Sequence, residues 1–424
     1  MFSNPKRMKA ARTGKESWFD YYAGFSTAFV RKALNDLLPD REGKVLDPWN
    51  GSGTTTAIAY ELGIKSTGID INPVMAVVAK AKLLAFGVKE SLVPLAQDIV
   101  AKSCSGSSEV RADDPLLEWF SRSGARSVRA LEQSIRKLLT PLGPAEPLTT
   151  SGALDSISDL AAFFFVALFR AARTFVCHFQ ATNPTWIRSP KTAQEKVRPN
   201  AEAMAREFIR NVEILIEGVV PLACDNATTI LLGSSERLSV ETASIQAVIT
   251  SPPYCTRIDY AVATKPELAV LGCPLRTDFV DLRRRMTGGP VISPIQNLPD
   301  DSWGHACLDL LKQVKSHPTK GSEGYYYKLF VQYYGSIRRS LEEINRVLVA
   351  NGHCVLVVQD SHYKEIHVDV ARYIAEMALD LNWSLEKRLD FDTRQVMARM
   401  NPKAKKYRAH TGATESVLWF RAAS

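Results

Sequence analysis

The chain has 424 residues, of which 46% are hydrophobic and 23% charged, the balance of a globular protein with a large buried core. This composition excludes a wholly disordered, collagen-like or disulfide-scaffold chain. An excess of 53 Lys and Arg over 45 Asp and Glu gives a formal charge of +8, which permits a polyanionic partner but does not require one.

The first hundred residues alternate between predicted helices and strands. Apolar residues at helical spacing indicate a helix over Tyr21–Leu38, and a proline near the first turn opens another over Pro73–Phe86. Between them lie two short strands, Lys44–Leu46 and Ser66–Ile71, separated by a helix over Thr54–Leu62. This order of strand, helix and strand predicts the opening of a doubly wound, mostly parallel α/β sheet.

Residues 113–222 differ from the preceding residues in their hydrophobic pattern. They contain long apolar stretches without the alternation typical of strands, so we predict an inserted helical subdomain. The stretches are Leu116–Phe120, Ile157–Phe169 and Phe208–Val220. The longest uninterrupted apolar run, Leu160–Phe169, is too short to cross a bilayer.

Strand and helix signals resume at Ile230. A strand over Gln246–Thr250 follows, whereas residues 286–300 and 313–324 read as loops. The remaining predicted elements are a helix over Tyr325–Val349 that ends at Asn351-Gly352, a strand over His353–Gln359, a helix over Val368–Leu381, and strands over Ser384–Asp390 and Glu415–Arg421. We therefore divide the chain into residues 1–110, a helical insertion at 111–225, and residues 226–424 with loop insertions at about 261–325.

The seven cysteines are odd in number, scattered and never spaced as CxxC, which favours reduced thiols over a zinc cluster or a disulfide framework. The histidines lack ligand spacing as well, so we predict no metal site. The basic N-terminal stretch has no apolar segment behind it that would indicate a secretory signal. We expect a cytoplasmic protein without a membrane segment.

The motif DPWNGSGTTT places an acid at the end of a strand, then a glycine-rich turn, then a helix. Gly51 and Gly53 lack side chains, so the turn lets the backbone approach a ligand closely. About twenty residues later, Asp70 stands at the end of the next strand, where a carboxylate can pair with ribose hydroxyls. The turn is neither GxGxxG nor a Walker motif, which disfavours a dinucleotide or a nucleoside triphosphate.

The motif SPPY, residues 251–254, follows the apolar strand QAVIT. Two prolines remove two N–H donors and leave carbonyl oxygens as fixed acceptors, Ser251 adds a hydroxyl, and Tyr254 adds a flat ring. This set suits a planar heterocycle that carries an exocyclic amine, because the oxygens accept its N–H groups while the ring stacks. Alone, SPPY is also a common way to end a strand.

Together, DPWNGSGTTT, GIDINP and TSPPY resemble the S-adenosylmethionine-dependent amino-methyltransferases of DNA, which form N4-methylcytosine or N6-methyladenine. The resemblance covers about residues 18–90 and 230–424 and leaves the helical insertion unmatched. It implies a Rossmann-like methyltransferase sheet, S-adenosyl-L-methionine as cofactor, double-stranded DNA as partner, and methyl transfer without a metal. A cognate restriction or defence partner and the oligomeric state stay open.

The resemblance implies roles for individual residues. Ser251, Pro252, Pro253 and Tyr254 match the catalytic turn. The implied cofactor-binding residues are Phe25, Ser26, Asp47, Pro48, Trp49, Gly51, Gly53, Thr54, Asp70, Asn72 and Ser234. Two of these positions depart from the family pattern: Trp49 replaces the usual phenylalanine, and Ser234 stands where an acid often contacts the adenine, with Glu236 as a substitute.

A serine before Pro-Pro-Tyr favours, in this family, cytosine N4 over adenine N6, although either hydroxyl or carboxylate could hold an amine. An RNA base or a protein glutamine amide is the alternative substrate. A relative that binds nucleic acid or cofactor without turnover is the alternative to an enzyme.

The recognition segment lies either in the helical insertion or after Tyr254. In the insertion, Trp186, Arg188 and Lys191 share a proline-bounded loop that suits base stacking and phosphate contact, or equally a structured turn with a buried Trp anchor. Near the catalytic turn, the candidate DNA contacts are Arg257, Tyr260 and Arg283, of which the first two could instead stabilise the fold. The basic runs 283–285 and 401–408 are either solvated surface or phosphate contacts.

Overall fold

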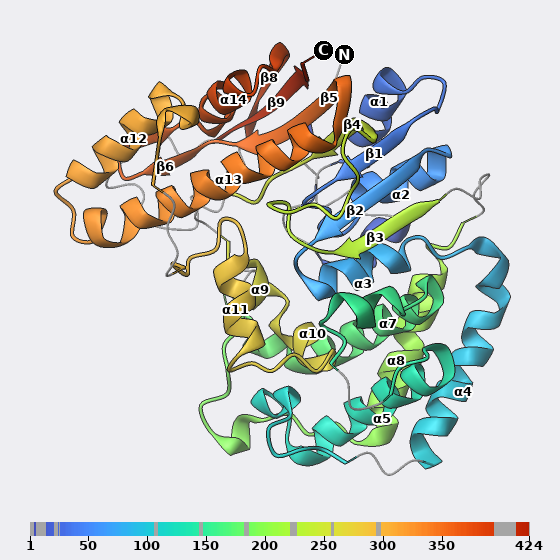
Figure 1. Cartoon of the computed structure of the whole chain (residues 1–424). Helices are drawn as coiled ribbons and strands as arrows, with labels where there is room; N and C mark the ends of the chain where they lie inside the picture. Colours follow the sequence, from blue (N-terminus) through green and yellow to red (C-terminus); the bar gives the residue numbers. More distant parts are fainter. Residues whose placement is uncertain are drawn as a thin grey trace.

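The structure is a computed structural model that describes residues 4–5, 14–20, 24, 26–105, 109–143, 147–181, 186–220, 227–255, 258–293, 298–393 and 413–423. Seven strands form one sheet in the order β3-β2-β1-β4-β5-β9-β8 (Figure 1). They are β1 (Lys44–Asp47), β2 (Lys65–Asp70), β3 (Thr228–Leu232), β4 (Ile245–Thr250), β5 (Leu348–Gln359), β8 (Ser384–Thr393) and β9 (Ala413–Arg421).

The first five strands in this order, β3, β2, β1, β4 and β5, pair in parallel with their neighbours. Strand β9 runs antiparallel to both of its neighbours, β5 and β8. A small hairpin, β6 (Ser361–Tyr363) with β7 (Ile366–Val368), lies outside this sheet. The mostly parallel α/β sheet predicted from the alternation of elements is confirmed. Because β1, β2 and β4 are parallel neighbours, their carboxyl ends lie at the same edge.

Alternate residues along the strands face two different cores, as strand geometry requires. On β1, Val45 joins a core built with α1 (Thr27–Leu37) and α2 (Thr54–Leu62). The next residue, Leu46, joins a core with α12 (His305–Ser316), α13 (Tyr327–Val347) and α14 (Val370–Asp380). Helices therefore cover both faces of the sheet, so it is doubly wound.

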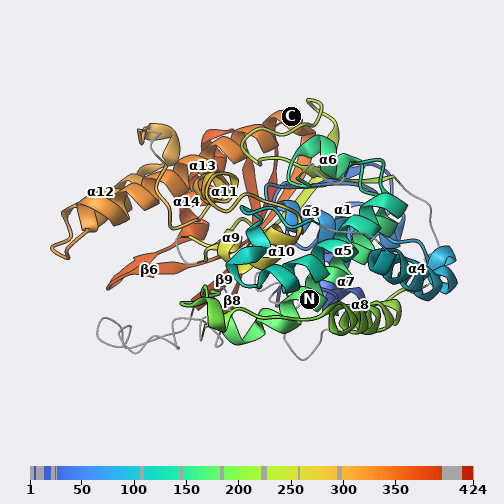
Figure 2. The same ribbon diagram turned by 90° about the horizontal axis from the view of Figure 1, so that it is seen from below.

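The insertion between β2 and β3 forms a third core of packed helices, the helical layer (Figure 2). Its helices are α3 (Pro73–Ala81), α4 (Leu92–Ser105), α5 (Arg122–Leu139), α6 (Ser151–Asp155), α7 (Asp159–Val176) and α8 (Ala201–Ile216). The α4 helix packs on α5 and α8, so this layer includes a helix that precedes residue 111. Within 111–222, the described residues form isolated bridges but no strand.

Helix α7 is longer than its apolar run indicated. With the following turn it spans Asp159–Phe179, which by length and composition is enough to cross a membrane. The same apolar side chains are buried against α3, α5 and α8. Burial in the helical layer accounts for this composition, because a helix that is apolar all round is also found in a large soluble core.

Three sequence predictions were wrong in detail. The long helix ends at Val347, and Asn351, with φ 60°, lies within β5, where the pairing with β4 is interrupted. The helix that begins at Pro73 ends at Ala81. The region expected to hold loops at 261–325 contains α9 (Tyr260–Ala263), α10 (Lys265–Val270), α11 (Asp278–Arg285) and α12. The prolines and glycines of 286–300 obscured the helical spacing of the apolar residues after His305.

Candidate active site

The glycine-rich turn after β1 depends on two left-handed residues. Gly51 has φ 48° and Gly53 has φ 76°, a region that disfavours any other residue type. A Cβ on Gly53 would lie 2.8 Å from the Cβ of Ala79 on α3, so the turn also needs the missing side chain for close packing. The chain can thus bend sharply from β1 into α2, as the sequence predicted.

The carboxylate of Asp70, at the end of β2, is hydrogen-bonded to the backbone of this turn. It accepts hydrogen bonds from the Gly51 N–H and the Asn72 N–H, each at 2.8 Å. Asn72 in turn caps α3 by accepting from the Val74 N–H at 3.1 Å, and its amide donates to Thr264 at 2.9 Å. The acid, the turn and the start of α3 therefore form one rigid unit.

Asp47 links the turn after β1 to the SPPY turn after β4. Its carboxylate accepts a hydrogen bond from the Thr250 hydroxyl at 2.5 Å, and Thr250 directly precedes Ser251. It also accepts from the Trp49 N–H at 3.2 Å. The side chain is 1% exposed, so Asp47 lies beneath the surface and fixes the spacing of the two turns.

The two turns line one cleft of about 840 Å³, including its open mouth. Three sets of residues form its walls: the glycine turn, the segment from Asp70 to Met75, and the SPPY turn with Tyr260. The members are Gly24, Pro48, Trp49, Asn50, Gly51, Ser52, Thr54, Asp70, Ile71, Asn72, Met75, Gly233, Ser234, Ser235, Ser251, Pro252, Pro253, Tyr254, Tyr260, Arg285, Met286 and Thr287.

Several polar atoms of the cleft wall are buried and have no hydrogen-bond partner among the described residues. They are the indole Nε1 of Trp49, the amide Nδ2 of Asn50 and the hydroxyl of Ser52. Buried polar atoms are usually paired, and unpaired ones cluster where a ligand or water binds. The turn therefore has the donors and the close backbone approach that a polar ligand needs.

The SPPY turn is held so that specific acceptors remain. The Ser251 hydroxyl donates to the Val357 carbonyl at 2.8 Å, so its oxygen lone pairs are what it can offer to a ligand. The Pro253 carbonyl accepts from the Tyr333 hydroxyl at 3.1 Å. The Pro252 carbonyl accepts no hydrogen bond from the part of the chain that the structure describes.

The Tyr254 backbone is fixed by two contacts. Its N–H donates to the Tyr260 hydroxyl at 3.1 Å, and its carbonyl lies where a Cβ on Gly288, which has φ 75°, would come within 2.5 Å. Tyr260 is itself buried at the start of α9. Tyr260, which the sequence predicted as a DNA contact, thus lines the cleft and holds the backbone of the SPPY turn.

We expect Tyr260→Phe to lower turnover about fivefold to tenfold, because it removes the hydroxyl that accepts from the Tyr254 N–H, a hydrogen bond worth about 1 kcal/mol. The measurement is kcat and KM of the reaction that the cleft carries out, together with the melting temperature. If kcat stays at the wild-type value, Tyr260 does not position Tyr254.

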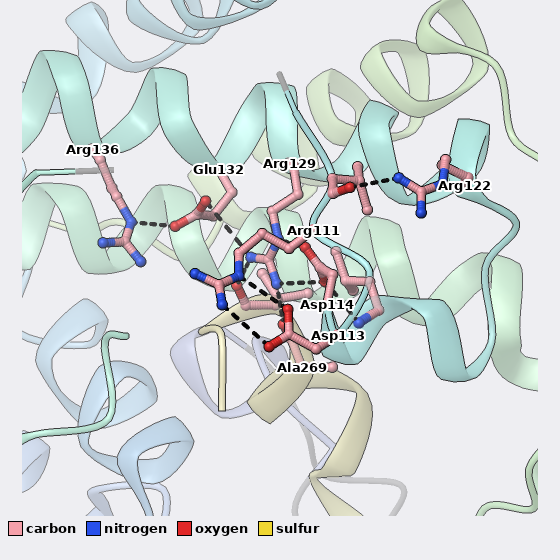
Figure 3. A network of polar contacts seen from close by, with 11 residues as sticks. Arg111, Asp113, Asp114, Arg122, Arg129, Glu132, Arg136 and Ala269 are labelled. Carbon is pink, nitrogen blue, oxygen red and sulfur yellow. Dashed lines mark hydrogen bonds and ion pairs between the residues drawn. The ribbon is translucent and has the colours of Figure 1, made fainter. Parts of the chain in front are cut away.

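Arginines of the helical layer bind the segment that follows Tyr260, and Figure 3 shows one of them, Arg129, beside Ala269. Arg129 on α5 donates to the Val270 carbonyl at 2.6 Å and the Ala269 carbonyl at 2.7 Å, at the end of α10, while Asp114 pairs with it at 2.8 Å. Arg173 on α7 donates to the Ala263 carbonyl at 2.8 Å and pairs with buried Glu267. The inserted helices therefore support the SPPY turn through α9 and α10.

Eleven of the fifteen predicted catalytic and cofactor-binding residues line the cleft, and of the six predicted DNA contacts Tyr260 does so. Asp47 and Gly53 lie behind its wall, and Ser26 begins α1 with its N–H bonded to the Pro5 carbonyl at 2.7 Å. Phe25 and Arg257 lie outside the described residues, as do residues 401–408.

Of the predicted DNA contacts in the helical layer, Trp186, Arg188 and Lys191 are all among the described residues. Trp186 is 45% exposed, whereas the buried anchor is Trp119, whose indole donates to the Arg188 carbonyl at 3.0 Å. Arg188 pairs with Glu195 at 3.1 Å and stacks on Phe179, and Lys191 is exposed. A buried Trp186 anchor was therefore wrong, and DNA contact by this loop stays a prediction.

Three cleft features were missed from the sequence. Tyr333 reaches Pro253 from a helix eighty positions away, and Met286 and Thr287, after the basic run that ends at Arg285, close one side of the cleft. Neither has a local signal, because both depend on how distant elements pack. Gly24 could have been found, since it lies inside YYAGFS, the segment that resembles the family.

Comparison with known proteins gives relatives of low identity. No family model matches the chain. It is 23% identical over 310 residues to the Type II methyltransferase M.BsoBI of Geobacillus stearothermophilus, which covers 60% of this chain and 52% of that protein. It is 22% identical over 418 residues to the Type II methyltransferase M.AvaI of Nostoc sp. and of Anabaena variabilis, which covers 89% of this chain and 80% of each. The chain is similar to type II methyltransferases.

The chain thus spans about half the length of the first of these relatives. Among solved structures, an rRNA methyltransferase, aviRa from Streptomyces viridochromogenes, aligns with a TM-score of 0.27 at 13% identity over 99% of this chain and 97% of that one. That score is too low to inform the fold, which follows here from the strand order and pairing.

Burial raises the pKa of both acids at this edge of the sheet. The Asp70 carboxyl has a pKa of about 6 instead of 3.8, because desolvation outweighs the hydrogen bonds from Asn72 and Gly51. Desolvation likewise raises the pKa of Asp47 to about 6, against the hydrogen bond from Thr250. The folded protein therefore holds these protons more tightly than the unfolded chain does.

This predicts a pH-dependent difference between the wild type and Asp70→Asn. Stability from a raised carboxyl pKa is present below the unfolded value and is lost as pH rises through about 6. Between pH 4 and pH 7 we expect the unfolding free energy of the wild type to fall, relative to the variant, by about 2–3 kcal/mol. Urea unfolding of both proteins at each pH measures it, and a constant difference would contradict the raised pKa.

Proposed function

We propose that this chain is an S-adenosyl-L-methionine-dependent DNA methyltransferase that methylates the exocyclic amine of a flipped base, cytosine N4 in preference to adenine N6. One observation carries the proposal: the glycine turn after β1 and the SPPY turn after β4 line the same cleft. A donor site and an acceptor site for a planar amine thus lie within reach of each other. The similarity to Type II methyltransferases along most of the chain supports it.

The cleft fits the proposed cofactor on its own chemistry. The Asp70 carboxylate, when ionised, accepts hydrogen bonds and suits ribose hydroxyls, and the unpaired atoms of Asn50 and Ser52 suit other polar groups. Gly24 lines the cleft, and the next two residues in the sequence, Phe25 and Ser26, are those we propose for the methionine end. When bound, S-adenosylmethionine supplies a methyl group activated by a sulfonium.

The adenine contact falls to Ser234 rather than to Glu236. Glu236 accepts hydrogen bonds from the Ser336 hydroxyl at 2.5 Å and from the Arg339 guanidinium at 2.7 Å, so its carboxylate is already used. Ser234 lines the cleft beside Ile71. A hydroxyl can donate or accept, which is enough for one edge of an adenine ring.

On the other side of the cleft, two oxygens are placed to hold an amine. The Ser251 oxygen, with its proton committed to Val357, and the Pro252 carbonyl both accept N–H groups. Tyr254 provides a face for stacking a base that has left the duplex. Holding the amine in a fixed direction aligns its nitrogen for in-line attack on the methyl carbon.

The choice of cytosine over adenine rests on Ser251 and on its resemblance to the family, since both bases carry an amine that these acceptors can hold. The relatives are designated Type II methyltransferases. In keeping with that designation we propose site-specific modification of double-stranded DNA in the cytoplasm, beside a restriction partner.

Incubation of the purified chain with methyl-labelled cofactor and, separately, DNA, RNA and protein tests this proposal. We expect label in DNA only, and N4-methylcytosine on nucleoside mass spectrometry of that DNA. N6-methyladenine would overturn the choice of base, and label in RNA or protein alone, or no label at all, would overturn the proposed function.

A further inference from the structure

A second cavity, of about 970 Å³ with its open mouth included, adjoins the cleft. The two share a wall, formed by Ile71, Ser234 and the segment from Arg285 to Thr287. The other lining residues are Glu236, Arg284 at the end of α11, Ser293, and three residues of α13, Gln332, Ser336 and Arg339. A group seated in this cavity would therefore lie directly beside whatever occupies the cleft.

The charges around the second cavity do not cancel. Arg339 is paired with Glu236 at 2.7 Å. Arg284 has no ion-pair partner among the described residues. Arg285 pairs with Asp281 at 2.8 Å, but both side chains are more than half exposed, at 60% and 58%, so that pair is weak and easily exchanged.

Arg283, the member of this run that the sequence favoured as a DNA contact, is differently placed. It donates twice to the buried carboxylate of Asp259, at 2.9 and 2.6 Å, and Asp259 caps the start of α9. Removing Arg283 would leave a buried charge unpaired behind the catalytic turn. Its guanidinium is therefore part of the fold, whereas Arg284 and Arg285 line the second cavity.

The wall that carries these arginines is anchored to α13. The Thr287 and Ser336 hydroxyls lie 2.7 Å apart, and the Gln332 side chain bonds the Ser293 N–H at 2.6 Å and the Val291 carbonyl at 3.1 Å. In Figure 1, α11 lies between α13 and the helical layer. The arginines thus project from a supported segment and not from a loose one.

We propose that Arg284 and Arg285 bind a backbone phosphate of the nucleic-acid substrate in this cavity. The proposal rests on the proposed function. A base that swings into the cleft stays covalently tied to its phosphate, so an anion must come to rest beside the cleft mouth. Guanidinium groups recognise phosphate oxygens by paired, charge-assisted hydrogen bonds, and Arg285 lines both hollows.

The test is binding of a DNA duplex, with S-adenosylhomocysteine present, by the wild type and by the double variant Arg284→Gln/Arg285→Gln over a range of salt concentrations. We expect the Kd to rise about tenfold at 0.1 M salt. The slope of log Kd against log salt should shrink by about 1, the loss of one phosphate contact. Arg206→Gln, an exposed arginine on α8, is the matched control and should change neither quantity.

The affinity for S-adenosylhomocysteine separates two sources of anion. It should be unchanged in the double variant, and a marked loss would mean that the arginines hold the cofactor's carboxylate instead. An unchanged salt slope in the double variant, or an equal loss in Arg206→Gln, would overturn the phosphate site alone. A wild type that neither binds nor methylates DNA would instead overturn the proposed function.

Discussion

Replacing Tyr254 by alanine is expected to lower kcat/KM for methyl transfer about 10- to 100-fold, because stacking of a base on an aromatic ring contributes about 1–3 kcal/mol. The ring lies in the cleft wall beside Ser251, while the backbone of Tyr254 is held independently by Tyr260 and by the close contact with Gly288. The truncation should therefore remove the stacking face without displacing the turn.

Tyr254→Phe is the matched variant, since it keeps the ring and removes only the hydroxyl. Steady-state kinetics on a DNA substrate, with the melting temperature and the S-adenosylhomocysteine affinity of each variant, give the comparison. We expect the phenylalanine variant to retain most of the activity and both variants to bind the product normally. An alanine variant with near-normal turnover would show that no base stacks on this residue.

Gly53→Ala is expected to destabilise the fold by about 2–5 kcal/mol. A non-glycine residue in the left-handed region costs about 1–2 kcal/mol. Forcing a methyl group into a packed contact costs about 1–3 kcal/mol more. Both conditions hold at Gly53, with φ 76° and backbone and side-chain atoms of Ala79 at 3.0 and 2.8 Å from the new Cβ.

Gly87→Ala offers the control within the same half of the chain. Gly87 is exposed, has no positive φ, and a Cβ built there meets nothing within 4 Å. Its unfolding free energy should stay within about 0.5 kcal/mol of the wild type. The comparison is made by measuring the urea midpoint of unfolding for Gly53→Ala and for Gly87→Ala. Equal midpoints would mean that the turn can relax away from α3 and that its geometry is not fixed by packing.

Local patterns predicted much of the first half of the fold, since they act within a few residues. The α2 helix starts and ends at the predicted residues, because the glycine turn before Thr54 and the glycine after Leu62 mark both ends. The insertion of β9 between β5 and β8 could not be predicted. Strand order depends on pairing between segments distant in sequence, which local propensity does not report.

In the candidate site, too, the features set by local sequence could be predicted and those set by packing between distant elements could not. The residues of the two motifs lie together because parallel neighbouring strands end at one edge, and that follows from the order of the elements. The supports of the site come from elsewhere: Tyr333 from α13, Arg129 from α5 and Arg173 from α7. Each was part of an unremarkable helical stretch in the sequence, because its role exists only once the helical layer packs.

A crystal structure of the chain with S-adenosylhomocysteine tests most directly whether donor and base share one cleft. We expect the ribose hydroxyls at the Asp70 carboxylate and the sulfur turned toward the Ser251 hydroxyl and the Tyr254 ring. Product bound outside the cleft, or bound there with its ribose away from Asp70 and its sulfur away from the SPPY turn, would contradict the account.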